Sequence, residues 1–224
     1  MSFFRKRNWQ AGLSTGRVES LSDSVFAIAM TILVIEISIP EVSRVALVAG
    51  DLHGFLSGLL PRFVSYGISF AVIGIFWMGH HLMFHFVKRT DRTFLWLNML
   101  FLMVITFIPF PAALIGQYAH KGVAVIVYGA TLEAASILFM ILWWYASRRR
   151  RLISSSMSDR LIMLAWKAVV VAPIVYGLAI FAAHLNPEWG IYLYILVPLI
   201  YIFPSPIDEL VHFASGDNSY ESTK

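Results

Sequence analysis

Residues 17–37 read RVESLSDSVFAIAMTILVIEI, an apolar run that carries several polar side chains. From Leu21 onward, its polar residues are Ser22, Asp23, Ser24, Thr31 and Glu36. A bilayer core is about 30 Å thick and a helix rises 1.5 Å per residue, so a membrane span needs roughly 20 mostly apolar residues. Polar groups within a span usually face protein or water. The stretch therefore predicts a membrane helix with one side turned away from lipid.

Two local patterns refine this helix. Ser20 and Asp23 have the spacing of a capping box, so we expect the helix to begin near Leu21. On 3.6-residue geometry one stripe runs along the helix through Ser24, Ile28, Thr31 and Ile35, with Ile32 at its edge. A stripe of this kind is typical of an ordinary helix-packing interface, where serine and threonine let backbones approach. It also fits a helix that lines a pore, and the spacing leaves both interpretations open.

Apolar runs recur along the rest of the chain. The sequence has 224 residues, of which 58% are hydrophobic and 13% charged, about half the charged fraction of a soluble domain. No small-residue cleavage signal follows the first run, so we expect it to remain in the mature protein. We predict an all-α integral membrane protein, with a segment 1–20, a six-helix domain 21–204 and a tail 205–224. The expected spans are 21–40, 56–86, 93–117, 122–146, 162–184 and 188–204.

Basic residues indicate the orientation of these spans, because short loops rich in Lys and Arg favour the cytoplasm. Twelve Lys and Arg residues fall on one predicted side before the C-terminal tail, whereas Arg44 and Lys121 fall on the other. We therefore expect both termini in the cytoplasm and a multi-pass protein of the cell membrane. This topology explains the net charge of +4 without nucleic acid as a partner.

The residue inventory argues against an enzyme. The chain has no cysteine, which excludes disulfides, thiolate metal sites and cysteine nucleophiles. His80 and His81 are adjacent, and adjacent side chains on a helix point about 100° apart, so they do not readily chelate one ion together. No nucleophile and base pair is evident, and we expect no catalytic residue, cofactor or resident metal.

Four short motifs stand out in the first half of the chain, namely RVESLSD at 17–23, FWMGHH at 76–81, LWLN at 95–98 and PFP at 109–111. Together they resemble the endolysosomal potassium channels of the transmembrane protein 175 family. The first helix of that family begins with Arg-x-x-x-Phe-Ser-Asp, and this chain has Leu21 in place of the phenylalanine. The likeness is specific over residues 15–118 and rests on general pattern beyond them.

The resemblance implies a single six-helix repeat that assembles as a homotetramer in the lipid bilayer and conducts potassium ions. Its pore would be lined by the first helix, with Ile28 as a hydrophobic constriction and with Ser24, Thr31, Ile32 and Ile35 along the same path. The chain lacks the Thr-Val-Gly-Tyr-Gly filter of most potassium channels, so selection would depend on side chains. The structural network around the signature would comprise Arg17, Leu21, Ser22, Asp23, Trp77, His80, His81 and Asn98.

One other membrane function stays open. A proton- or cation-coupled secondary transporter needs coupling carboxylates near the middle of the membrane and often repeated halves. Glu133 is the acid deep in the fourth expected span, and no internal repeat accompanies it. A satisfied contact with a neighbouring helix would explain Glu133 equally well.

Overall fold

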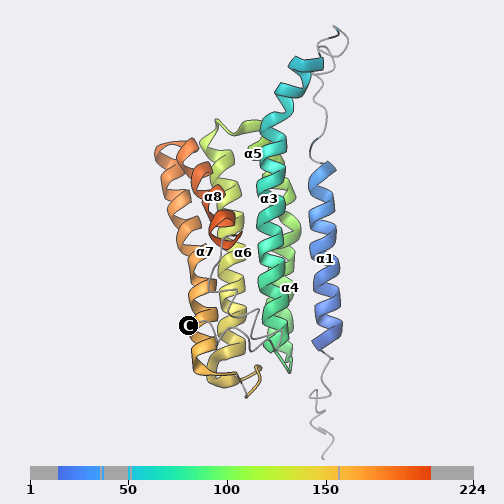
Figure 1. Ribbon diagram of the computed structural model, residues 1–224, viewed down its shortest axis with the longest axis vertical. Helices are drawn as coiled ribbons and strands as arrows, with labels where there is room; N and C mark the ends of the chain where they lie inside the picture. The colour runs from blue at the N-terminus through green and yellow to red at the C-terminus, as the bar shows by residue number, and fades with distance from the viewer. Residues whose placement is uncertain (1–14, 36, 38–49, 51, 156, 203–224) are drawn as a thin grey trace, which may run out of the picture.

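The computed structural model describes residues 15–35, 37, 50, 52–155 and 157–202. Within them the chain is helical, apart from a β-bridge between Val87 and Ile153. Figure 1 shows long helices arranged side by side. They are α1 (Thr15–Ile35), α3 (Leu52–Phe86), α4 (Arg92–Phe107), α5 (Pro109–Tyr118), α6 (Gly122–Ser147), the short 3-10 helix η1 (Arg148–Arg150), α7 (Asp159–Leu185) and α8 (Pro187–Ile202).

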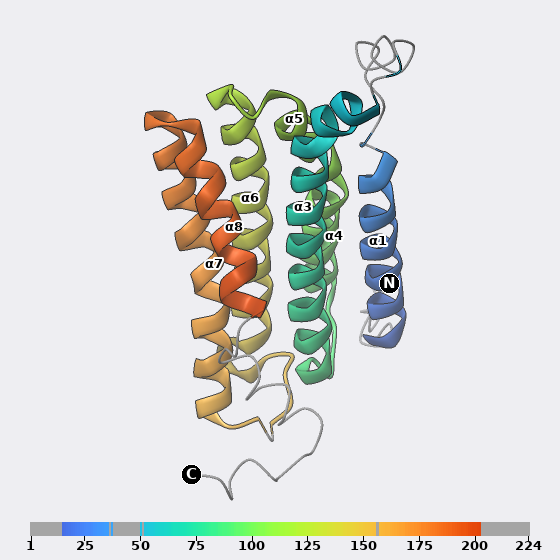
Figure 2. The same cartoon turned by 45° about the horizontal axis from the view of Figure 1, so that its top comes forward.

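Five segments of the described chain are long and apolar enough to cross a membrane. They are α1, α3, α4 with α5, α6 with η1, and α7. The helix α8 has 16 described residues, and the predicted span 188–204 continues beyond them. The predicted all-α membrane class is therefore confirmed, with five spans by length and α8 as a shorter helix beside α7 (Figure 2).

The helices form two groups that share a core. On one side α1 lies along α3 and α4, and on the other α7 and α8 pack against α6 (Figures 1 and 2). Phenylalanine rings fill the space between the groups, and Phe101 lies within 6.0 Å, centroid to centroid, of Phe26, Phe76 and Phe139. The core therefore connects the first helix to the fourth span through α3 and α4.

One predicted boundary was wrong. The helix α1 begins at Thr15 rather than near Leu21, because Ser20 does not cap it. The Ser20 hydroxyl instead donates to the carbonyl of Gly16, 2.8 Å away and one turn earlier. The predicted span 93–117 corresponds to the apolar segment Arg92–Tyr118, within which the helix breaks at Ile108, since Pro109 and Pro111 lack the amide hydrogens that would continue α4. Residues 1–14, much of the first connection and the tail 205–224 lie outside the described residues.

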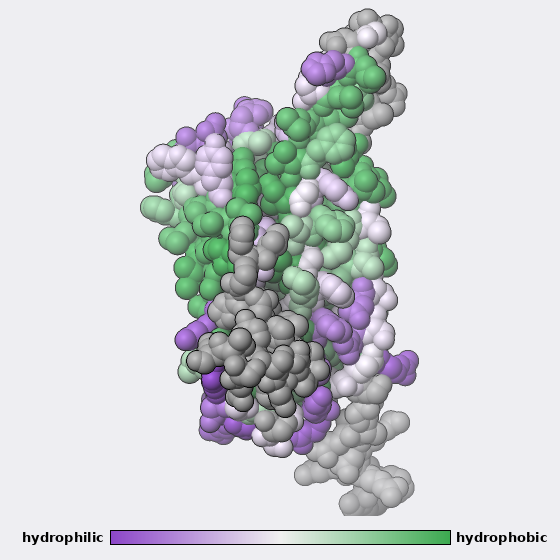
Figure 3. Space-filling view, viewed as in Figure 1, coloured by the Kyte–Doolittle hydropathy of each residue, from purple (hydrophilic) through white to green (hydrophobic). Residues whose placement is uncertain are grey.

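Basic residues gather at one end of the helix bundle. The starts of α1, α4 and α7 and the ends of α3 and α6 all lie at this end (Figure 1), and Figure 3 shows hydrophilic residues there below an apolar band. Arg62, which was left out of the count of Lys and Arg on the two sides, lies towards the other end. A Cβ at Gly116 of α5 would lie 3.3 Å from the Cα of Arg62. Among the described residues, Lys and Arg are therefore more numerous at one end of the bundle, as predicted, and Arg62 is one more basic residue at the other end.

Close packing joins α6, α7 and α8. A Cβ at Gly190 of α8 would lie 2.8 Å from the Cβ of Ala183 on α7, so the two backbones approach through small residues. A Cβ at Gly129 of α6 would collide with the ring of Tyr194. The Tyr194 hydroxyl crosses this space and donates to the carbonyl of Val125, 3.1 Å away. These three helices therefore pack closely at Gly129 and Gly190.

Candidate functional site

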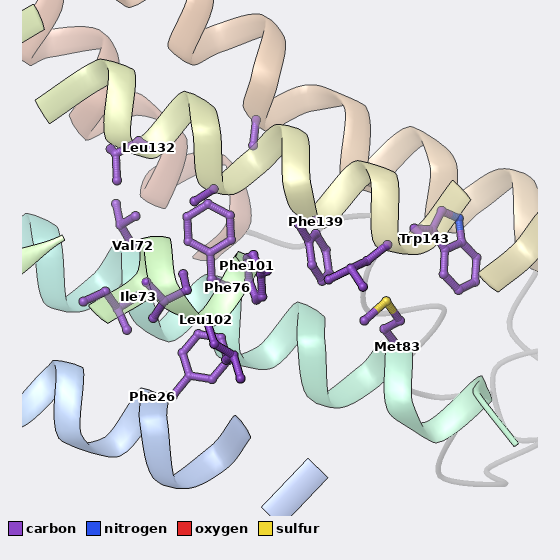
Figure 4. Packing of buried hydrophobic residues seen from close by; sticks show 14 of the residues in the cluster. Phe26, Val72, Ile73, Phe76, Met83, Phe101, Leu102, Leu132, Phe139 and Trp143 are labelled. Carbon is purple, nitrogen blue, oxygen red and sulfur yellow. The ribbon is translucent and has the colours of Figure 1, made fainter. Parts of the chain in front are cut away.

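The helix α1 has one buried face. Small, apolar and hydroxyl side chains on it pack against α3 and α4, and Phe26 points from α1 towards them in Figure 4. The buried positions recur every three or four residues, as on one face of a helix, so they form a single stripe. Its buried residues are Val18, Ser22, Phe26, Ala29 and Leu33.

The predicted stripe lies on another side of α1 and is exposed in the subunit. Ile28 and Ile35 are 55% and 70% exposed, more than an ordinary core position allows. The Ser24 hydroxyl donates to the carbonyl of Ser20, and the Thr31 hydroxyl donates to that of Ile28, each at 2.8 Å. Each hydroxyl oxygen therefore keeps acceptor capacity for a cation or water. The side contains Leu21, Ser24, Ile28, Thr31, Ile32 and Ile35.

A chain of buried hydrogen bonds fixes α1 to its neighbours. The Ser22 hydroxyl donates to the carbonyl of Val18, 2.9 Å away, and accepts from the amide of Asn98 at 3.1 Å. The Asn98 carbonyl oxygen lies 2.8 Å from Nε2 of His80. All three side chains are at most 1% exposed. Buried polar groups are costly when unpaired, so this chain specifies how α1, α3 and α4 fit together.

Aromatic rings hold His80 in place. The ring of Phe101 lies nearly parallel to it, at 5.7 Å between centroids and 9° between planes, and Phe84 lies 4.6 Å away. The ring of Phe26 from α1 completes the surroundings at 5.5 Å. Packing on three sides gives the imidazole little freedom, so its Nε2 stays directed at Asn98.

A second set of contacts joins α1 to α3 nearer the basic end of the bundle. The indole Nε1 of Trp77 donates to Oδ1 of Asp23 at 3.0 Å. Nδ1 of His81 lies 3.2 Å from Oε1 of Glu19. The rings of Trp77 and His81 stack at 5.9 Å with 25° between their planes. These side chains are partly exposed, in contrast to the buried chain through Ser22.

The structure brings most of the predicted network together. Ser22, His80 and Asn98 form the buried chain, and Asp23, Trp77 and His81 form the partly exposed set. Leu21 is 49% exposed and lies outside both. Within the described residues no ion pair joins Arg17 to Asp23, whose Oδ1 accepts from Trp77. His80 reaches the signature through Asn98 rather than directly.

Sequence reasoning missed Glu19. It precedes Asp23 by one helical turn, so both carboxylates project from the same side of α1. That spacing could have been read from the sequence, but the identity of the α3 residue opposite them could not. The contact with His81 depends on how α3 is aligned beside α1.

Asp91 organises the basic end of the bundle. It begins α4, where its carboxylate accepts from the backbone amide of Phe94 at 2.9 Å. Tyr145 donates to it at 2.9 Å, and Arg151 forms an ion pair at 3.0 Å. Burial alone would raise the pKa of Asp91, but these hydrogen bonds and the charge of Arg151 outweigh it and lower the pKa.

The fold and site define a helical membrane protein whose first helix is attached by polar contacts on one side and exposed on another. The family model for the endosomal/lysosomal potassium channel TMEM175 matches residues 17–109. A potassium channel of Chryseobacterium sp. is 32% identical over 192 residues, which cover 86% of this chain and 94% of that one. This chain therefore belongs to the TMEM175 family.

Two further similarities concern one organism. A potassium channel of Chamaesiphon minutus is 42% identical over 128 residues, and the match covers 56% of this chain and 62% of that relative, less than two thirds of its length. The crystal structure of a lysosomal potassium-selective channel TMEM175 homolog from Chamaesiphon minutus aligns with a TM-score of 0.73 at 34% identity. That alignment covers 83% of this chain and 94% of the other. The matched family is one of ion channels, which agrees with the expectation that the chain is not an enzyme.

Proposed function

We propose that this chain is one subunit of a homotetrameric, potassium-selective channel with six spans per subunit and a pore lined by α1. The observation that supports it best is the division of α1 into two sides. One side is buried against α3 and α4, while the side with Ile28 is exposed and carries hydroxyls. An exposed stripe of hydroxyl and branched apolar side chains suits a helix that meets its symmetry copies around water.

Ile28 is the proposed hydrophobic constriction. Four isoleucine side chains meeting on a symmetry axis would expel water and make the passage of ions costly until they move apart. Its exposure of 55% in the subunit leaves the side chain available for such a meeting. Ile32 and Ile35 would extend the apolar path on the same side, and their exposure is 38% and 70%.

Selection in this channel would depend on partial dehydration and on hydroxyl oxygens. A narrow apolar ring removes water from a passing ion, and potassium loses its water at a lower cost than sodium. The Thr31 hydroxyl donates to its own helix, so its oxygen can face the ion as an acceptor near the ring. This arrangement favours potassium modestly, because it lacks a continuous cage of carbonyl oxygens.

The proposed location is the cell membrane with both termini in the cytoplasm. The described Lys and Arg residues concentrate at the end of the bundle where α1 begins, and short basic segments favour the cytoplasm. Trp144 and Tyr145 lie at the same end, with Arg148 and Arg151 over their rings at 4.9 and 4.6 Å. Aromatic and basic side chains of this kind suit the boundary between lipid and water.

The deciding experiment reconstitutes the protein in liposomes with opposing potassium and sodium gradients. The wild type should give a reversal potential that favours potassium. Ile28→Asn at matched protein density should conduct more and show a reversal potential closer to zero, because a polar ring no longer expels water. The size of the current and the reversal potential are both measured in recordings from these liposomes.

Val34→Asn is the matched control. Val34 is 54% exposed on the same helix but lies about 120° around it from Ile28, outside the proposed pore stripe. It should leave the reversal potential unchanged. Absence of passive current in the wild type, or equal effects of both substitutions, would contradict a pore along this stripe.

A coupled secondary transporter is the second candidate, and Glu133 is the observation that favours it. Its Oε2 is buried in α6 and has no hydrogen-bond partner among the described residues. Gly177 of α7 packs near the carboxylate, where a Cβ would lie 3.9 Å from Oε1. A coupling role predicts that flux in liposomes requires a counter-ion gradient and stops in Glu133→Gln, whereas a channel keeps passive current in that variant.

A further inference from the structure

We propose that Glu19, Asp23 and His81 bind a divalent transition-metal ion that links α1 to α3. Each residue offers one ligand atom, and these atoms all lie within 4.8 Å of one another. Two of the ligands come from α1 and the third from α3, so an ion bound here connects two helices. The adjacent His80 faces the buried core, and it takes no part in this site.

The spacing of the side chains suits a three-ligand site. Glu19 and Asp23 are one helical turn apart, which places their carboxylates side by side. Nδ1 of His81 lies 3.2 Å from Oε1 of Glu19, close to the separation of about 3.4 Å that two ligands have around a tetrahedral zinc ion. The other separations are within 4.8 Å, so Asp23 completes the set after a small side-chain movement, which its partial exposure allows. A water molecule would take the fourth position.

Trp77 supports the ligands from outside the metal position. Its Nε1 donates to Oδ1 of Asp23 at 3.0 Å, which orients the carboxylate and leaves Oδ2 to bind the ion. Its ring stacks on that of His81 at 5.9 Å, which limits rotation of the imidazole. Outer contacts of this kind commonly change metal affinity by 10- to 100-fold.

The donor set indicates the class of ion. Calcium and magnesium prefer sites built of oxygen ligands, with six or more positions filled. One imidazole and two carboxylates with an open position instead suit zinc, cobalt or nickel. We therefore infer a site for a zinc-like ion rather than for an alkaline-earth ion.

Such an ion would act on the proposed pore helix. The buried chain through Ser22 fixes one face of α1, while Asp23 and Glu19 reach α3 on a neighbouring side. A bound ion would tighten this second attachment and oppose any movement of α1 away from α3. This consequence rests on the proposed pore along α1, whereas binding itself does not.

Cobalt binding to the purified protein, without a histidine tag, tests the site directly. Tetrahedral Co²⁺ bound to protein absorbs visible light far more strongly than hydrated Co²⁺, so a titration reports both binding and geometry. The wild type should show saturable absorption that zinc removes. His81→Ala and Glu19→Gln should weaken binding by at least about tenfold, and Trp77→Phe by about 10- to 100-fold.

His85→Ala is the matched control, because His85 lies one turn beyond His81 on α3, is exposed and is not part of the set. It should bind cobalt like the wild type. The absence of saturable binding in the wild type, or equal binding by the wild type and His81→Ala, would overturn the proposal. An equal loss in His85→Ala would do the same.

Channel recordings separate this inference from the proposed function. If zinc lowers current in wild-type liposomes but not in those with His81→Ala, both the site and its action on conduction are supported. Saturable binding with no change in current would keep the site and overturn its action on α1. Absence of any current would count against the channel and leave the binding result standing.

Discussion

The helix α1 and the group α6, α7 and α8 differ in how they are attached to the molecule. In the apolar window of α1 22% of the residues are buried, against 50% in the window that contains α6. The first helix is attached by one buried stripe and by a few hydrogen bonds through Ser22 and Asp23, whereas the group is held by close contacts over Gly129 and Gly190. A few directional contacts can hold a helix in one register and still release it. Close contacts over glycine leave less freedom at those points.

This contrast suits a channel in which one helix moves against a fixed support. If Ile28 is the constriction, opening would require displacement of α1, and the exposed side of this helix offers no packing in the subunit that would resist it. The group α6 to α8 would then serve as the support, through the rings shared with α3 and α4. Substitutions in the two regions should therefore have different consequences for stability and conduction.

The largest effect should come from a side chain added at Gly129. A Cβ there would lie 2.8 Å from Cζ of Tyr194 and 2.9 Å from Cγ1 of Ile180. Gly129→Val should displace Tyr194, break its hydrogen bond to Val125 and lower the free energy of unfolding by about 3 kcal/mol or more. The free energy is measured by detergent titration of the purified protein.

Gly67→Ala supplies the comparison on α3. A Cβ at Gly67 meets nothing within 4 Å among the described atoms, so the substitution should stabilise the helix by about 0.4–1 kcal/mol. If Gly129→Val were as stable as the wild type, α6 and α8 would have more freedom than their contact implies.

A double-mutant cycle across α1 and α4 should give the next largest effect. Ser22→Ala removes the acceptor of the Asn98 amide in a buried place, and it should cost about 1–3 kcal/mol. Asn98→Leu should cost a similar amount, because it also leaves Nε2 of His80 without its partner. The combined variant should show a coupling energy of about 0.5–3 kcal/mol in the same titration.

Both single variants should also raise channel activity if α1 moves on opening. Weaker attachment of α1 favours any state in which this helix has left α3 and α4. The expected result is higher open probability in bilayer recordings at unchanged selectivity, since Ile28 and Thr31 are intact. Strictly additive stability losses with unchanged open probability would show that the buried chain does not control α1.

The sequence predicted the helical membrane class and most members of the network, because both depend on local patterns. Apolar length indicates spans, and the signature motifs indicate which polar residues belong together. The break at Ile108 could have been predicted from Pro109 and Pro111, although the apolar run continues through them. The start of α1 was predicted wrongly because Ser20 bonds within the helix as readily as it caps one.

Contacts between helices could not be predicted in the same way. The pairs formed by Glu19 with His81 and by Gly129 with Tyr194 join residues far apart in the sequence. They depend on the rotation and register of one helix against another, which hydrophobic periodicity does not specify. The roles of Ile28 and of the exposed stripe concern contacts between subunits, and they stay predictions.

The smallest effect concerns Asp91 at the basic end, and it depends on pH. The pKa of Asp91 is lowered from its ordinary value of 3.8, because hydrogen bonds and Arg151 favour the charged form over the cost of burial. Its stabilising contribution is therefore fully present above about pH 4 and is lost as the pH falls through the lower folded-state value.

Asp91→Asn should reduce stability by less than about 1 kcal/mol at pH 7, because Arg151 is half exposed and an asparagine still caps α4. The difference from wild type should shrink in acid, as measured by thermal unfolding at several pH values. Asp159→Asn is the control, since the Asp159 side chain is 94% exposed beside Arg150, and it should change stability less than Asp91→Asn at pH 7. A difference between Asp91→Asn and wild type that persists at the lowest pH would mean that Asp91 acts by shape as a helix cap rather than by its charge.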